Sequence, residues 1–243
     1  MMMKTTRFAA LILMASATVS ANPPPRDAPP SVAAYLDQVA AIEKPGPRTS
    51  LEPVYNAALA AQNDLMTITK DQAWIEYLSD AEFADLRSRL KGFVLSRGLD
   101  IFADPDPKFF RALAEKRGEP ADLAFFTLME KSIAPDYLPI YVKPQGRGVC
   151  VRYGEDLIAP YYASWLEYQR QSPGRYKDKV TESLANVEDA ISLGTCACGE
   201  IQSVQHELSG FLNRFPTAPV NNKIRDRIEQ LDKDPWKLPV RCT

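Results

Sequence analysis

Amphipathic segments at helical spacing are the feature that most restricts the fold of this 243-residue chain. Apolar residues recur three and four positions apart along most of the sequence, and cap residues and prolines bound the segments. The predicted helices span residues 31–43, 50–66, 79–98, 106–118, 119–133, 155–171, 176–193, 201–215 and 220–231. The pattern predicts an all-α or nearly all-α fold, a single multi-helix bundle of about eight helices.

Residues 137–153 break the helical pattern. Pro139, Pro144, Gly146 and Gly148 interrupt a run of β-branched and aromatic residues. Such a run predicts an extended stretch or a short hairpin, and it contains Cys150.

The first 21 residues are typical of a secretory signal peptide. Lys4 and Arg7 precede an apolar stretch over residues 8–17, and Val19-Ser20-Ala21 forms a small-residue cleavage site. The stretch is too short to span a bilayer well, so we expect no integral membrane segment after cleavage and a periplasmic or secreted protein. The predicted organisation is a signal peptide over 1–21, a Pro-rich arm with one short helix over 22–49, and a helical domain over 50–243.

The charge balance argues against a nucleic-acid partner. The chain has 29 Lys and Arg against 31 Asp and Glu, and loss of the two signal-peptide cations leaves a net charge of −4. Residues 143–179 hold seven basic and four acidic side chains. This segment is the place where a basic surface could form, although a mild excess usually marks only a solvated face.

Four cysteines in an exported chain predict two disulfides. A bond between Cys196 and Cys198 would close a strained ring. We therefore expect Cys150 to pair with one of these two cysteines and Cys242 with the other. The alternative is a thiol redox protein using the Cys-x-Cys pair, but the βαβ context of known redox motifs is absent.

Familiar catalytic motifs are missing. His206 is the single histidine, it lies off the apolar stripe of its predicted helix, and Gly210 stands where a zinc-protease helix needs its second histidine. The sequence has no Gly-x-Ser-x-Gly elbow, phosphate-binding loop or Rossmann fingerprint, so we predict no cofactor.

The acidic run over residues 100–106 does not predict a metal site. Its prolines and the missing closing Glu do not fit a calcium-binding loop. We interpret Asp104 and Asp106 as turn and N-cap residues.

Paired carboxylates support one enzymatic alternative, a cell-envelope carbohydrate hydrolase. Glu155 and Asp156 precede an aromatic-rich helix with Tyr161 and Trp165, and glycosidases need only two acids. Acids in a first helical turn are also expected simply because they favour the helix dipole.

The leading hypothesis is a non-catalytic protein that binds a protein or envelope component, with an inhibitor, immunity-like or accessory role. Tyr141, Arg147, Arg152 and Tyr153 lie in the loop that a disulfide is expected to hold. Arginine and tyrosine are enriched at binding hot spots, and a cross-linked loop loses less entropy on binding. The alternative is that Tyr141 and Tyr153 pack inward while the arginines are solvated.

Overall fold

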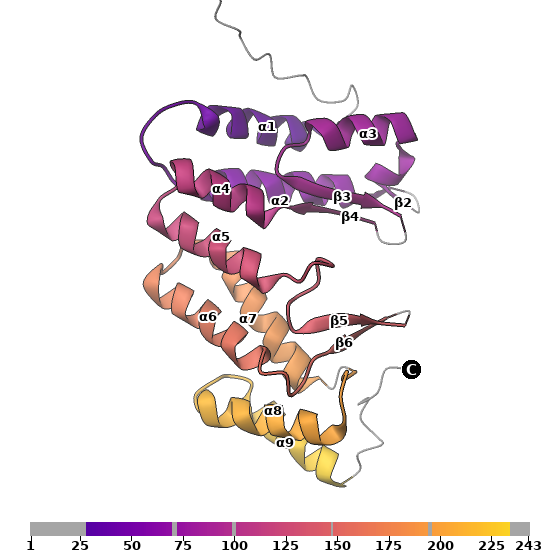
Figure 1. Cartoon of the computed structure of the whole chain (residues 1–243), viewed down its shortest axis with the longest axis vertical. Helices are drawn as coiled ribbons and strands as arrows, with labels where there is room; N and C mark the ends of the chain where they lie inside the picture. Colours follow the sequence, from indigo (N-terminus) through magenta and orange to yellow (C-terminus); the bar gives the residue numbers. More distant parts are fainter. Residues whose placement is uncertain (1–27, 70–71, 99–100, 147, 194–195, 234–243) are drawn as a thin grey trace, which may run out of the picture.

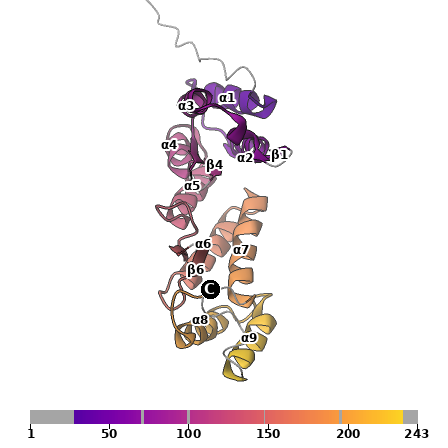
Figure 2. The ribbon, with the colours of Figure 1, turned by 90° about the vertical axis from the view of Figure 1, so that its right-hand side faces the viewer.

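The computed structural model describes residues 28–69, 72–98, 101–146, 148–193 and 196–233. The protein is mostly helical, as predicted, and its elements follow one another along the long axis of the molecule. Helices α1 to α4 lie at one end, and α8 and α9 lie at the other (Figures 1 and 2).

Nine α-helices form the described part of the chain. They are α1 Pro30–Glu43, α2 Glu52–Met66, α3 Asp80–Arg89, α4 Pro107–Arg117, α5 Pro120–Ser132, α6 Ile158–Gln171, α7 Lys177–Ser192, α8 Ile201–Arg214 and α9 Asn221–Lys233. A short 3-10 helix, η1, covers Trp74–Tyr77. Most helix ends fall within a few residues of the predicted ones, because prolines and cap residues act locally.

Three antiparallel two-stranded sheets accompany the helices. Their strands are β1 Ile68–Thr69, β2 Gln72–Ala73, β3 Phe93–Arg97, β4 Ile101–Pro105, β5 Val142–Gln145 and β6 Gly148–Val151. The last pair confirms the predicted hairpin with Cys150, which is paired in register with Lys143. The first two pairs were not predicted.

The predicted helix over 79–98 is wrong beyond its third turn. The capping box is confirmed, since Ser79 Oγ accepts from the Glu82 N–H at 3.3 Å and the Glu82 carboxylate accepts from the Ser79 N–H at 2.8 Å. However, α3 ends at Arg89, and Gly92 turns the chain with a φ of 71°. A Cβ at Gly92 would lie 2.4 Å from the Phe109 ring, so this turn requires glycine.

The two aspartates before α4 have different roles. Asp106 is the N-cap as predicted, since its carboxylate accepts from the Lys108 N–H at 3.0 Å and Pro107 opens the helix. Asp104 is not a turn residue, because it lies in β4 opposite Val94.

Buried side chains form two hydrophobic clusters. The N-terminal core is rich in aromatic rings and is built mainly by α1, α2, α4 and α5; its largest fully buried members include Tyr35, Phe110, Phe125 and Phe126. The C-terminal core is smaller and is built by β6 and α6 to α9, around residues such as Ile191 and Phe211. Helices α6 and α7 contribute to both clusters, so they join the two ends of the molecule.

Helix α1 is part of the N-terminal core. Val32 and Tyr35 are fully buried, and the Tyr35 hydroxyl donates to the Lys91 carbonyl at 2.7 Å. The predicted signal peptide and the Pro-rich residues 22–27 lie outside the described residues.

A disulfide fastens the β5–β6 hairpin to the segment before α8. Cys150 is bonded to Cys198, as one of the expected pairings requires. The Val151 N–H donates to the Cys196 carbonyl and the Cys198 N–H donates to the Val151 carbonyl, each at 2.9 Å. Cys196 is also disulfide-bonded, while Cys242 lies outside the described residues.

Candidate functional site

A cleft of about 240 Å³ opens between α2 and β4 on one side and α6 and α7 on the other. We call it the central cleft. Its aromatic wall consists of Tyr55, Tyr137, Tyr141, Tyr161 and Trp165. Its polar side chains are Gln62, Asp104, Ser132, Lys179, Glu182, Ser183 and Asn186. Clefts with apolar walls and a few convergent polar groups are the usual form of ligand sites.

An ion network fixes the helices that surround the central cleft. Arg175 contacts Glu52 at 3.0 Å, Glu119 at 2.6 Å and Asp122 at 2.8 Å, and the Tyr176 hydroxyl donates to Asp122 at 2.6 Å. These residues lie where α2, α5 and α7 begin, and helix N-termini favour carboxylates. One arginine thus ties together three helices that line the cleft.

Asp104 is an acid of the central cleft whose pKa is shifted by its surroundings. The Gln62 amide donates to its carboxylate at 2.5 Å. Burial nevertheless raises the pKa of Asp104, and the nearby Lys179 ammonium and the Gln62 hydrogen bond offset only part of this rise. Lys179 itself pairs with Glu182 at 2.9 Å. The polar side chains of the cleft are therefore one cation, two acids, two amides and two serines.

Helix α6 carries the aromatic wall on successive turns. Tyr161 and Trp165 are four residues apart, with ring centroids at 6.1 Å, and Tyr141 packs edge-to-face on Tyr161 at 5.1 Å. Burial raises the pKa of the Tyr161 hydroxyl. Trp165 is fully buried, and its indole N–H lies beside the Tyr161 hydroxyl.

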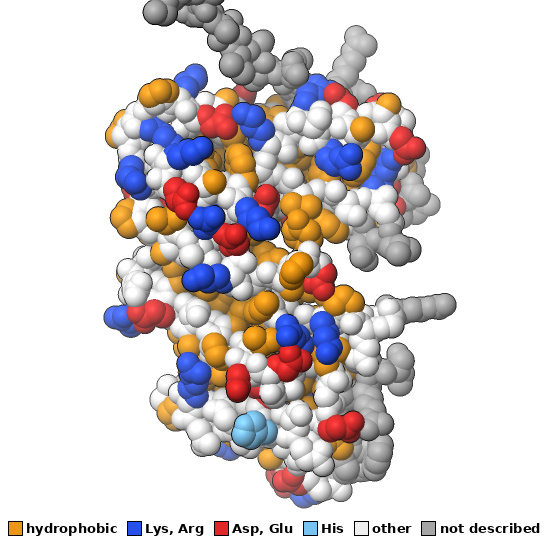
Figure 3. Space-filling view, viewed as in Figure 1, with side chains coloured by type: hydrophobic (Ala, Val, Ile, Leu, Met, Phe, Trp, Pro, Cys, Tyr) orange, Lys and Arg blue, Asp and Glu red, His pale blue; other side chains and the backbone are white. Residues whose placement is uncertain are grey.

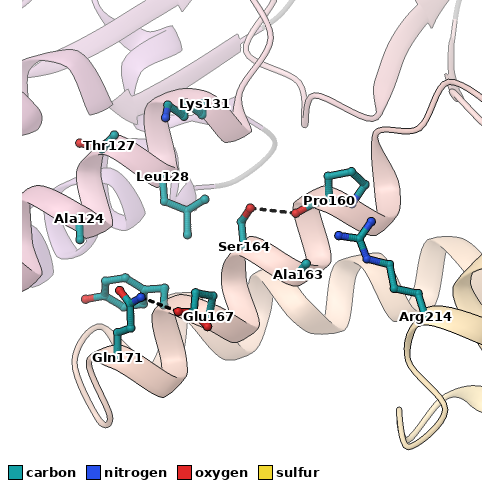
Figure 4. A pocket seen from close by; sticks show the side chains of 11 residues that line it. Ala124, Thr127, Leu128, Lys131, Pro160, Ala163, Ser164, Glu167, Gln171 and Arg214 are labelled. Carbon is teal, nitrogen blue, oxygen red and sulfur yellow. Dashed lines mark hydrogen bonds between the residues drawn. The ribbon is translucent and has the colours of Figure 1, made fainter.

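A second, more open groove of about 510 Å³ runs between α5 and α6 (Figure 4). Its lining includes the small side chains Ala124 and Ala163 and the basic side chains Lys131 and Arg214. Ser164 Oγ donates to the Pro160 carbonyl at 2.8 Å, as drawn in Figure 4. This groove is larger than the central cleft and also has polar side chains, among them Glu167 and Gln171, but Tyr168 is the one aromatic residue in its lining.

The structure divides the four predicted binding residues. Tyr141 and Tyr153 are each 3% exposed and pack inward; Tyr141 lines the central cleft, and the Tyr153 hydroxyl donates to the Ala190 carbonyl at 2.6 Å. Arg152 pairs with Glu155 at 2.6 Å and donates to the Ile140 carbonyl at 3.0 Å. Arg147 lies outside the described residues. Only Tyr141 is therefore placed at a concave site.

Ion pairs offset the local basic excess of residues 143–179. Arg152, Arg170, Arg175 and Lys179 each contact at least one carboxylate. On the face in Figure 3, basic and acidic side chains are interspersed over the N-terminal helices. Four of the seven basic side chains of residues 143–179 are thus paired with a carboxylate in the described structure.

The predicted acid pair lies outside both concave sites. Glu155 and Asp156 are exposed and line neither the central cleft nor the α5–α6 groove. The hydrogen bond from Arg152 lowers the pKa of Glu155, which disfavours a general acid. His206 is exposed, as its position off the apolar stripe predicted.

The Cys-x-Cys pair does not close on itself, because Cys198 is bonded to Cys150. Within the described residues no cysteine is free, and no group of three or more His, Cys, Asp or Glu side chains could hold a metal ion. No helix in the described part of the chain combines the length and apolarity needed to cross a membrane.

Sequence reasoning singled out Tyr141 but missed the polar residues that line the central cleft. Asp104 was interpreted as a turn residue, and Lys179 and Glu182 were not singled out. One signal was present: Tyr161 and Trp165 share a helix face. No signal along the chain connects that face to Asp104, which lies far away in the sequence.

Comparison with protein-family models, curated proteins and solved structures finds no match to this chain.

Proposed function

We propose that the protein is exported and acts non-catalytically, as a binding protein that holds an envelope-derived or extracellular ligand in the central cleft. The observation that carries the proposal is the cleft itself, which is lined by aromatic side chains, including the exposed Tyr137 and the half-buried Tyr161, and by several polar side chains. The signal-like N-terminus and the disulfide support an oxidising compartment.

The state of the polar groups in the central cleft favours binding over catalysis. Glu182 is paired with Lys179, and Ser132 Oγ donates to the Leu128 carbonyl at 2.7 Å. His206 is not among the residues that line the cleft. Neither serine of the cleft therefore has the histidine base that a serine nucleophile commonly requires.

A carbohydrate hydrolase is the second candidate, carried by different acids from those that the sequence suggested. Asp104 has a raised pKa and shares the central cleft with Glu182. Glycosidases use two carboxyl groups in one site, one of them with a raised pKa. A hydrolase would release products from its substrate, whereas a binding protein would leave its ligand unchanged.

The test measures the thermal stability of the oxidised mature protein with the low-molecular-mass fraction of an envelope extract. A ligand at about 100 times its Kd should raise Tm by about 5–10 °C, since ligand that binds the folded state stabilises it. Asn186→Trp, at an exposed position lining the cleft, should abolish this rise. Thr181→Trp is the control, because Thr181 is exposed on the same helix and does not line the cleft.

No shift with the wild-type protein, or an equal shift in the Asn186→Trp variant, would overturn the proposal. A shift accompanied by new products in the extract would favour the hydrolase instead.

A further inference from the structure

We propose that the α5–α6 groove is a docking surface for a helical segment of a protein partner, with acidic side chains at the end of that segment that reaches Lys131 and Arg214. The groove shares no lining residue with the central cleft. The inference therefore goes beyond the proposed function, and either of them can fail without the other. It is drawn from the shape of the groove, its small side chains and its two cations.

The groove is formed by one face of each of two neighbouring helices. On α5 its lining follows the i, i+3, i+4, i+7 spacing of a helix face, with Ala124, Thr127, Leu128 and Lys131. On α6 the same spacing runs from Pro160 to Gln171. The lined stretches cover about two turns of α5 and about three turns of α6. A third helix laid along the groove would contact both faces, which is a recurrent mode of peptide recognition.

Small side chains let a helix approach the groove closely. Ala124 and Ser164 are exposed, and the distance between packed helix axes depends on the size of the side chains at the contact. The Ser164 hydroxyl already donates to the Pro160 carbonyl at 2.8 Å. An apolar surface can therefore cover this hydroxyl without leaving its donor unmet. The lining suits a helix face of small apolar residues.

The groove carries two positive charges that the protein does not pair. Lys131 and Arg214 are exposed, and neither contacts a carboxylate anywhere in the described ranges of the chain. The one acid of the lining, Glu167, is paired at 2.6 Å with Arg170, which lies outside the groove. The charge of the lining is therefore complementary to an acidic partner.

The two cations lie toward the same end of the groove. Figure 4 shows Lys131, Pro160 and Arg214 toward one end and Ala124 and Gln171 toward the other. Each cation is in the last turn of its helix, α5 or α8, where the helix dipole favours it. These positions are thus stable without an internal carboxylate, and the side chains stay available to a partner. The acids of a docked helix are expected at one end only, which fixes its direction.

The form of the groove favours a protein segment over a small anion or a membrane. Pockets for small molecules bury most of the ligand surface, whereas an open groove between two helices covers one side of its occupant. Membrane-surface helices place large apolar side chains beside their cations. Among the described residues that line this groove, Leu128 and Tyr168 are the only large apolar ones, and neither is exposed.

The experiment selects binders from a displayed library of helical peptides of about 16 residues, enough for three turns with flanking residues. The oxidised mature protein is the target, and peptides that also bind Ala124→Trp are removed. Ala124 is exposed and lines the groove, so a tryptophan there should obstruct it. Ala185→Trp makes the same change at an exposed position of α7 outside the groove and should keep binding. Equal Tm values of both variants show that they are folded.

The recovered peptides should carry Asp or Glu in one terminal turn. Reversal of both cations, in Lys131→Glu with Arg214→Glu, should weaken their Kd by about tenfold in calorimetry at low salt. Lys116→Glu is the control, because Lys116 is exposed in the last turn of α4 and lies outside the groove. It should leave the Kd unchanged.

The proposal would be overturned if no peptide distinguishes the wild type from Ala124→Trp, or if the recovered peptides bind the charge-reversed variant equally well. Sedimentation tests the second copy as occupant: a dimer that Ala124→Trp abolishes would assign the groove to self-association instead. Binding of inorganic phosphate or of phosphatidylglycerol vesicles that is lost on charge reversal but kept in Ala124→Trp would assign the cations to a small anion or a lipid surface, and would also overturn it.

Discussion

The N-terminal and C-terminal cores are stabilised by different means. The N-terminal core interlocks aromatic rings: Phe125 stacks on Tyr176 at 3.7 Å and meets Tyr55 and Phe126 edge-to-face. The C-terminal core is smaller and is closed by the Cys150–Cys198 disulfide. Small cores bury too little surface to be stable by packing alone, so a cross-link has more to add there.

The two cores also treat buried charge differently. In the N-terminal half, the buried Asp122 is paired with Arg175. In the C-terminal core, Arg227 is 3% exposed and donates to the Ala190 and Ile191 carbonyls near the end of α7, at 3.2 Å and 2.7 Å. A cation at a helix C-terminus is favourable, so Arg227 stabilises the C-terminal end of α7. Arg175 instead joins the N-terminal ends of three helices.

The largest expected effect is loss of a ring from the aromatic core. Phe125→Ala should lower the free energy of unfolding by about 3–5 kcal/mol, because it leaves a cavity among rigid rings. Urea unfolding measures the loss. The control Ile68→Ala, at a side chain that is 70% exposed, should change stability by no more than about 0.5 kcal/mol.

Removal of the disulfide should have the next largest effect, confined to the C-terminal core. The double variant Cys150→Ala and Cys198→Ala opens a loop of 48 residues and should cost about 2–4 kcal/mol. Hydrogen exchange should rise in β6 and α8, whereas the amides of α2 and α5 should keep their protection. Equal loss of protection in both regions would show that the two cores unfold as one unit.

Loss of the arginine that joins three helices should have a smaller effect. Arg175→Gln removes the paired cation from the fully buried Asp122, which keeps hydrogen bonds from the Tyr176 hydroxyl and the Glu119 N–H, and we expect a loss of about 2 kcal/mol. Arg170→Gln is the control, because Arg170 is exposed and pairs only with Glu167. Similar losses in the two variants would contradict a special role for the junction.

The smallest effect concerns pH. Burial raises the pKa of Asp104, so the folded protein holds this proton more tightly than the unfolded chain does. The contribution of Asp104 to the free energy of unfolding is therefore largest below the unfolded pKa of about 3.9. It is lost as pH rises through the higher pKa of the folded state. Asp104→Asn should gain stability relative to wild type as pH rises from 4 to 7, measured by urea unfolding across that range. A gain that does not change with pH would contradict this assignment.

Local chemistry made much of the helical fold predictable. Ser79 with Glu82, Asp106 with Pro107, and Glu119 with Pro120 all lie where helices begin. The end of α3 was missed because Phe93 and Val94 continue the helical spacing, whereas the turn at Gly92 is required by the Phe109 ring, which belongs to another helix. The spacing of apolar residues along one segment carries no information about a ring on another helix.

The sequence by itself determined the mostly helical class, the start of most helices and the choice of Cys150 as a cross-linked residue. Caps and prolines act on neighbouring residues, and four cysteines allow only a few pairings. Only the tertiary structure decided that Tyr141 and Tyr153 pack inward and that Asp104 shares a cleft with Trp165 and Lys179. These residues come from separate elements, and the packing of the two cores around α6 and α7 brings them together.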